Sequence, residues 1–97
     1  FEVPMLPFYN GVTGNAWLEN GGVYVLANIR GGGEFGPKWH QAGLKEKRQT
    51  VYNDFHAIAE ELISKKITSA KHLGIMGGSN GGLLVGVAFT QRPDLYN

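Results

Sequence analysis

The chain has 97 residues, 42% of them hydrophobic and 18% charged, which is typical of a folded globular protein and unlike a disordered one. Its formal net charge is +1, with both signs mixed along the sequence, so nothing points to a nucleic-acid or anionic-membrane partner. It contains no cysteine, which excludes disulfide, thiolate and zinc–thiolate chemistry. No signal peptide is visible, and cytoplasm and periplasm both stay open as compartments.

The first half of the chain is predicted to hold one buried strand between loops. Prolines and glycines predict a loop over residues 1–15, and a short helix is expected over 16–21. Residues 22–29 are apolar and rich in β-forming residues, which predicts a strand buried on both faces, as in a parallel sheet. A glycine-rich loop over 30–36 and a polar stretch over 37–49 follow.

The clearest helix is predicted over residues 50–66, with Thr50 as its N-cap. A turn over 68–71 then leads to a second strand-like run over 72–76. The apolar residues of the helix recur every three or four positions and fall on one face: Val51, Phe55, Ile58, Ala59, Leu62 and Ile63. A strand, a helix and a strand in this order predict a right-handed parallel crossover.

The residues after the second strand fit the G-x-S-x-G pattern of a nucleophile elbow. A helix-like run follows them and is expected to end before Pro93. Such a strand-to-helix turn strains the backbone of its serine and lifts the hydroxyl above the sheet edge. The alternative is a glycine-rich turn with an inert serine. The elbow residues are Gly77, Gly78, Ser79, Asn80 and Gly81, and we expect a side chain at the glycines to collide with strand or helix.

The uncharged run over residues 73–91 is long enough to cross a membrane. Ser79 and Asn80 lie near its middle among several glycines, which disfavours membrane insertion and a continuous helix. We therefore expect no membrane span. Because two strands do not make a stable sheet, we expect the chain to be a piece of a larger α/β domain.

Five motifs of this chain occur together in one enzyme family, in this order and spacing: residues 27–36, 39–40, 53–55, 77–84 and 91–95. On these motifs the chain resembles the catalytic domain of the prolyl oligopeptidase family of serine peptidases, which has an α/β-hydrolase fold. The resemblance implies that residues 1–97 are a partial peptidase catalytic domain without the family's β-propeller. It also implies a peptide substrate, no metal or organic cofactor, and the rest of the catalytic domain as a partner.

The resemblance assigns two catalytic roles. Ser79 would be the acylated nucleophile, and the backbone N–H of Asn80 would donate to the oxyanion. The family's second donor is a tyrosine hydroxyl in a Tyr-Gly-Gly-Phe motif. Phe1 matches the last residue of that motif, so the tyrosine would lie upstream, and Tyr9 does not fit the role.

The remaining triad members are expected outside this chain. The fold uses the order Ser, then Asp or Glu, then His, yet all three histidines (His40, His56 and His72) precede Ser79. The histidines do not have metal-ligand spacing, and we expect each to be solvated or hydrogen-bonded. Asp94 follows Ser79 but is better read as a local cap or turn former. We therefore expect the isolated chain to be inactive, and a non-catalytic fragment or pseudoenzyme remains the alternative.

The glycine-rich loop also matches the dinucleotide-binding fingerprint through Gly31, Gly33 and Gly36. Asp54 lies about 20 residues further on, as a ribose-binding acid would. That acid should end a second strand, however, and Asp54 lies in the predicted helix. Dinucleotide binding is therefore a distant third interpretation.

Two interpretations of the same loop stay open. In the first, the loop is a tight turn that needs a positive φ, with Arg30 and Glu34 as a local ion pair. In the second, Arg30, Glu34 and Trp39 lie on the substrate side of the active site. Trp39 is otherwise expected to serve core or lid packing.

Overall fold

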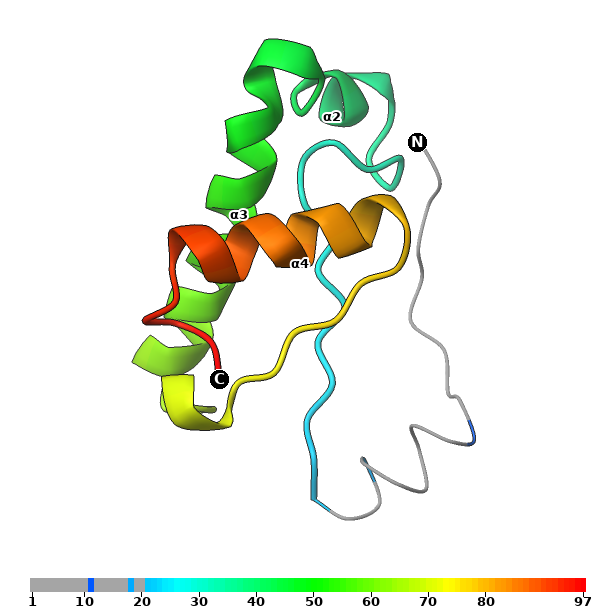
Figure 1. The fold of residues 1–97 in the computed structure, drawn as a ribbon. Coiled ribbons are helices and arrows are strands. Elements are labelled where there is room, and N and C mark those ends of the chain that lie inside the picture. The colour runs from blue at the N-terminus through cyan, green and yellow to red at the C-terminus, as the bar shows by residue number, and fades with distance from the viewer. Residues whose placement is uncertain (1–10, 12–17, 19–20) are drawn as a thin grey trace.

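The computed structural model describes residues 11, 18 and 21–97 (Figure 1). The loop predicted over residues 1–15 and most of the short helix predicted over 16–21 lie outside the described residues. Within them the elements are, in order, α2 (Pro37–Gln41), the 3₁₀ turn η2 (Lys45–Lys47), α3 (Arg48–Ser64), the 3₁₀ turn η3 (Ala70–His72) and α4 (Asn80–Gln91).

Helix α3 confirms the predicted long helix but begins two residues earlier, at Arg48. The N-cap is Lys47, and it makes no side-chain capping hydrogen bond, so the prediction that Thr50 caps this helix is wrong. The reason is that η2 runs directly into α3, and the Lys47 N–H already donates to the Leu44 carbonyl over 2.9 Å. Thr50 therefore lies inside the helix rather than at its start.

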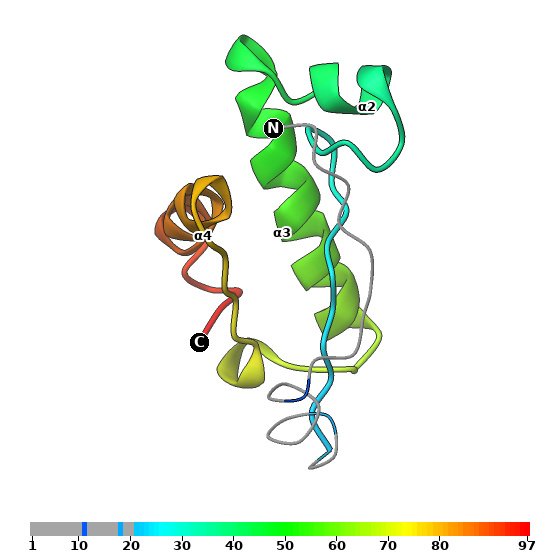
Figure 2. The same cartoon turned by 90° about the vertical axis from the view of Figure 1, so that its right-hand side faces the viewer.

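Helices α3 and α4 run in different directions and cross each other (Figures 1 and 2), and each contributes one residue to the core. Helix α4 ends at Gln91, which confirms the predicted stop before Pro93. Leu73 and Ile75, from the segment that leads to α4, pack against the core together with Phe55 and Ile63. The core itself consists of Ala59 from α3, Ala88 from α4, and Leu95 and Tyr96 from the C-terminal segment.

Neither predicted strand is a hydrogen-bonded strand in the described part of the chain. Residues 22–29 form an extended trace without regular structure, His72 belongs to η3, and residues 73–78 are likewise irregular. The two segments stand apart in Figure 2. A β-ladder needs a neighbouring strand about 4.8 Å away, and the described residues offer neither segment such a neighbour. The expected parallel strand–helix–strand unit is therefore not formed as a sheet.

Both extended segments instead line one open groove with a cavity volume of about 850 Å³. Phe55, Ile58, Ala59 and Leu62 of α3 contribute to the same groove. Large apolar side chains are exposed along it, among them Val23 and Met76, the latter 71% exposed. An exposed apolar surface of this kind marks a site where another part of a protein packs. No helix in the described residues is long and apolar enough to cross a membrane.

Candidate functional site

The turn between residue 76 and α4 has the geometry expected of a nucleophile elbow. Ser79 is the N-cap residue of α4, with φ 55° and ψ −120°, and it is exposed. A positive φ is uncommon for a residue with a side chain and costs of the order of 1–3 kcal/mol. The turn is closed by two 2.9 Å hydrogen bonds, from the Gly81 N–H to the Gly78 carbonyl and from the Gly82 N–H to the Ser79 carbonyl. The strained turn expected from the sequence is present.

The elbow needs glycine at one position for a clear steric reason. A Cβ on Gly77 would collide with the backbone oxygen of Gly81 and lie 2.5 Å from its carbonyl carbon. At Gly78 and Gly81 a Cβ would meet no atom within 4 Å among the described residues, apart from the helix's own backbone near Gly81, so a collision there stays a prediction. The chain folds back most tightly at Gly77, since the first turn of α4 passes directly over that residue.

Asn80 begins α4, so its N–H lies at the positive end of the helix macrodipole. In the described residues this N–H has no hydrogen-bond partner. The Asn80 side chain, by contrast, is anchored, because its Oδ1 accepts a hydrogen bond from Nη2 of Arg48 at 2.5 Å. Sequence reasoning missed Arg48, since 32 residues separate it from Asn80 and no local pattern links the two.

None of the three histidines hydrogen-bonds to Ser79 in the part of the chain that the structure describes. Nδ1 of His40 lies 2.7 Å from the Gly31 carbonyl oxygen, and Nδ1 of His72 lies 3.0 Å from the Ser69 hydroxyl. His56 is buried and bonds to Tyr96 and Gln91. The expectation that each histidine is solvated or hydrogen-bonded is confirmed, although His56 faces α4 rather than solvent.

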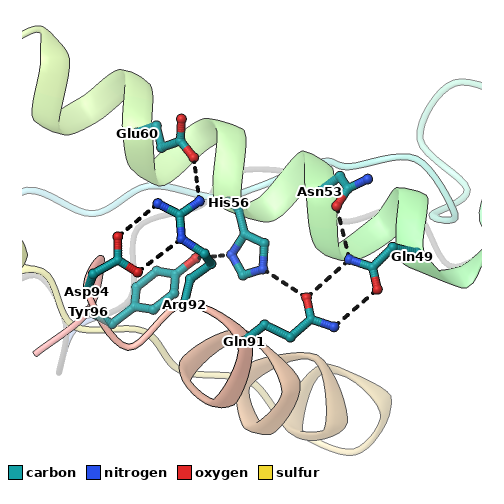
Figure 3. Close-up of polar contacts among 8 residues, drawn as sticks. All are labelled: Gln49, Asn53, His56, Glu60, Gln91, Arg92, Asp94 and Tyr96. Carbon is teal, nitrogen blue, oxygen red and sulfur yellow. Dashed lines mark hydrogen bonds and ion pairs between the residues drawn. The ribbon is translucent and has the colours of Figure 1, made fainter.

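His56 lies at the centre of a polar network between α3 and the end of α4 (Figure 3). Gln49 and Gln91 exchange two hydrogen bonds of 3.1 Å, and His56 Nε2 lies 3.2 Å from the same Gln91 oxygen that accepts from Gln49. Nε2 is therefore the protonated nitrogen, and Nδ1 accepts from the Tyr96 hydroxyl at 2.9 Å. Burial raises the pKa of Tyr96, which keeps its hydroxyl protonated as this donor.

Asp94 lies in the turn over residues 93–95, as expected of a turn former. Its carboxylate accepts hydrogen bonds from Arg92 at 2.8 and 3.0 Å, and these lower the pKa of Asp94. Arg92 also pairs with Glu60 of α3 at 2.8 Å, which fastens the end of α4 to α3 (Figure 3).

The glycine-rich loop is a tight turn with positive φ at Gly31 (105°) and Gly36 (92°). The predicted ion pair between Arg30 and Glu34 is wrong, because Arg30 pairs with Asp54 of α3 instead. The Arg30 guanidinium approaches both Asp54 oxygens, at 2.6 and 2.9 Å, and the Arg30 backbone N–H donates to Asp54 as well. The guanidinium hydrogen bonds lower the pKa of the Asp54 carboxyl.

This ion pair bears on both functional interpretations of the loop. Asp54 lies inside α3 and is occupied by Arg30, so it does not have the place of a ribose-binding acid at a strand end. For Arg30 the geometry favours the structural alternative. A substrate-side role for Glu34 and Trp39 stays a prediction.

Trp39 lies on α2, a helix that the sequence reasoning missed. The signal was Pro37 directly after Gly36, since proline is favoured at the first position of a helix. The indole packs edge-on against Phe35, with ring centroids 5.0 Å apart. Its buried Nε1 has no hydrogen-bond partner in the described residues. The described residues also hold no group of three or more histidine or acidic side chains suited to a metal ion.

Comparison with known proteins adds independent evidence on this arrangement. A family model described as the prolyl oligopeptidase family matches residues 12–97. The chain is 69% identical over 97 residues to an uncharacterized peptidase of Sinorhizobium fredii, covering 100% of this chain and 13% of that protein. It is 48% identical over 95 residues to a prolyl endopeptidase of Elizabethkingia miricola, covering 98% of this chain and 13% of that protein.

A solved structure of a post-proline cleaving enzyme from Rickettsia typhi matches with a TM-score of 0.96 at 58% identity. The match covers 99% of this chain and 14% of that one. The chain therefore spans about 13% of the length of the curated relatives that it matches.

Proposed function

Because the chain belongs to the prolyl oligopeptidase family, we propose that residues 1–97 are part of the catalytic domain of a serine peptidase and that Ser79 is its acylated nucleophile. One observation carries this proposal. Ser79 has a strained backbone at the first turn of α4 and is exposed, and the Asn80 N–H beside it has no hydrogen-bond partner among the described residues. In a nucleophile elbow such a turn exposes the serine hydroxyl for attack and places the N–H of the next residue beside it as an oxyanion donor.

In this mechanism Ser79 Oγ attacks the carbonyl carbon of the scissile peptide bond and gives up its proton to a general base. The Asn80 N–H donates to the oxyanion that forms, a contact worth about 3 kcal/mol in comparable sites. Collapse of the tetrahedral intermediate breaks the C–N bond, and the leaving amine takes the proton. Water then hydrolyses the Ser79 ester and restores the serine.

The general base and its orienting acid come from the remainder of the catalytic domain. His40, His56 and His72 each bond elsewhere, and in this fold the acid and the histidine follow the serine. The isolated 97-residue chain is accordingly inactive. Recovery of the downstream sequence tests this directly, since an acid and then a histidine must appear there in that order.

The remainder of the domain also completes the sheet of the α/β-hydrolase fold. The groove beside residues 22–27 and 73–77 is apolar, and both segments are extended, as strands are before pairing. Strands from the rest of the polypeptide fill this groove and convert the two segments into members of a parallel sheet. The match to a solved post-proline cleaving enzyme along nearly the whole chain supports this arrangement.

The substrate class is a short peptide cleaved after proline. The names of two relatives support this proposal, since one is a prolyl endopeptidase and one a post-proline cleaving enzyme. The test is hydrolysis of matched chromogenic peptides that carry either proline or arginine before the scissile bond, by the full-length protein and its Ser79→Ala variant. Faster cleavage after proline that depends on Ser79 is expected. Faster cleavage after arginine would overturn the specificity, and turnover by Ser79→Ala would overturn the nucleophile.

A further inference from the structure

Arg48 holds an unusual position for a cation, because it is the first residue of α3. The N-terminal end of a helix carries partial positive charge, so a guanidinium there is disfavoured. In the described part of the chain no carboxylate pairs with Arg48, and the first turn of α3 contains no acidic residue. Neutralisation of a nearby charge therefore does not explain why an arginine occupies this position.

The half-buried guanidinium of Arg48 instead bridges two polar groups. Nη2 donates to Oδ1 of Asn80 at 2.5 Å, and Nε donates to the hydroxyl of Tyr52 at 3.3 Å. Tyr52 is buried, with 9% of its surface exposed, and lies one turn further along α3. Tyr52 thus fixes the direction of the guanidinium, and the guanidinium fixes the side chain of Asn80.

Asn80 is the residue whose N–H faces the developing oxyanion in the proposed mechanism. Its peptide plane adjoins the strained backbone of Ser79, where a small rotation would turn the N–H away from the carbonyl oxygen. A side-chain anchor on Asn80 opposes that rotation without touching the substrate. We infer that Arg48 is a positioning residue that aims the Asn80 N–H into the oxyanion hole, an inference that rests on the proposed function.

The neighbouring residue Gln49 supplies a matched control. It also joins α3 to α4, but at the opposite end of α4, through its exchange of hydrogen bonds with Gln91. Loss of Gln49 removes a contact between the same two helices and leaves the elbow untouched. A role of Arg48 in helix packing alone would make Arg48→Ala and Gln49→Ala behave alike.

The experiment is steady-state hydrolysis of a proline-containing chromogenic peptide by the full-length protein, with thermal unfolding measured on every variant. Arg48→Ala is expected to lower kcat about tenfold while KM changes less than about twofold, since the lost contact acts on the transition state. Arg48→Lys retains a donor and is expected to recover part of kcat. Gln49→Ala is expected to keep kcat within about twofold of the parent protein.

Two further variants complete the test. Asn80→Ala retains the backbone N–H but removes the anchor, and Arg48→Ala is expected to have no further effect on kcat in that background. If Arg48→Ala does not fold, Arg48→Lys and Asn80→Ala carry the test, and kcat unchanged in both would overturn the inference. If the parent protein is active and Arg48→Ala and Gln49→Ala have equal kcat, the positioning role of Arg48 is overturned and the proposed function still stands. A parent protein without Ser79-dependent turnover would instead overturn the proposed function.

Discussion

Ser79 carries backbone strain that its surroundings must hold in place. A residue with a side chain at φ 55° costs of the order of 1–3 kcal/mol, and such strain persists only where neighbouring contacts over-determine it. Two contacts do this here. The fold-back at Gly77 sets the position of the turn, and the Arg48 anchor fixes the residue that follows the serine.

Gly77→Ala tests the steric part of this account. The new Cβ would overlap the backbone of Gly81, so the turn must open, and we expect a loss of about 1–3 kcal/mol of stability together with lower activity. Thermal unfolding and peptide hydrolysis of the full-length protein measure both effects. Gly86→Ala is the matched control, since a Cβ there meets nothing within 4 Å in the described residues and alanine favours the helix. Equal stability of Gly77→Ala and the parent would contradict the clash.

The Arg30–Asp54 ion pair predicts a pH dependence. The pKa of Asp54 is lowered below its ordinary value of 3.8, chiefly by the hydrogen bonds from Arg30. The stability that the pair contributes is therefore fully present above pH 3.8 and is lost as the pH falls through the lowered folded-state pKa. We expect Asp54→Asn to be less stable than the parent at neutral pH and the difference to shrink on acidification, as measured by thermal unfolding.

Glu61→Gln serves as the control for that series. Glu61 pairs with Lys65 on the exposed side of α3, where its side chain is 61% exposed, and such surface pairs contribute little. A gap between Asp54→Asn and the parent that stays constant from neutral to acidic pH would show that the ionised Asp54 carboxylate is not responsible.

At the residue scale, the sequence predicted features that neighbouring residues encode and missed contacts between residues far apart in the chain. The G-x-S-x-G spacing predicted the strained turn at Ser79 because a five-residue turn is encoded within its own residues. The partners of Arg30 and Asn80 lie 24 and 32 residues away, so no local pattern points to them. The steric need for glycine at Gly77 likewise depends on how α4 folds back.

At the scale of elements, one buried histidine contributes to the contact between α3 and the end of α4. His56 is 6% exposed and uses both ring nitrogens, one for the Tyr96 hydroxyl and one for Gln91. A buried polar group that loses its partner costs more than the hydrogen bond itself contributed. The hydrogen bonds of His56 therefore stabilise the packing of the C-terminal end of α4 against α3.

Tyr96→Phe tests whether the His56 network stabilises this contact. The variant leaves His56 Nδ1 without its donor, and we expect a loss of about 1–3 kcal/mol in stability. A double-mutant cycle with His56→Ala measures the coupling, which we expect to exceed about 0.5 kcal/mol because the two side chains are in direct contact. Additive effects of the two changes on thermal unfolding would show that the His56–Tyr96 contact does not contribute to stability.

The elements themselves were predictable to differing degrees. Helices α3 and α4 followed from apolar spacing and from Pro93, because amphipathic periodicity and proline act locally. Helix α2 has five residues and is too short for a periodic signal. The segments over 22–29 and 73–78 have strand-like sequences, yet a strand exists only through its neighbours, which the described residues do not supply.

At the scale of the whole molecule, the described residues expose more apolar surface than a complete domain does. No large side chain among them is fully buried, whereas Val23, Met76 and Phe89 are each more than half exposed. A stable monomer seldom leaves a large apolar groove, such as the one that Val23 and Met76 line, open to water. The groove between α3 and the extended segments is where we expect the rest of the catalytic domain to pack.

The isolated 97-residue chain should therefore behave differently from the full-length protein. We expect it to bind a hydrophobic dye such as ANS, to unfold without a sharp thermal transition and to lack peptidase activity. Its core is small, and its two strand-like segments have no partner strands among the described residues. Dye fluorescence and calorimetry of the two proteins side by side measure this. A sharp transition and Ser79-dependent turnover by the isolated chain would show that it is a self-sufficient domain.

The central claim is that Ser79 is the acylated nucleophile, and covalent labelling tests it most directly. The full-length protein would be treated with a fluorophosphonate, digested and analysed by mass spectrometry, with Ser79→Ala treated in parallel. We expect one adduct on the peptide that contains Ser79 and none on the variant. An unlabelled Ser79 in folded full-length protein would contradict the account and leave the elbow as a turn without catalytic function.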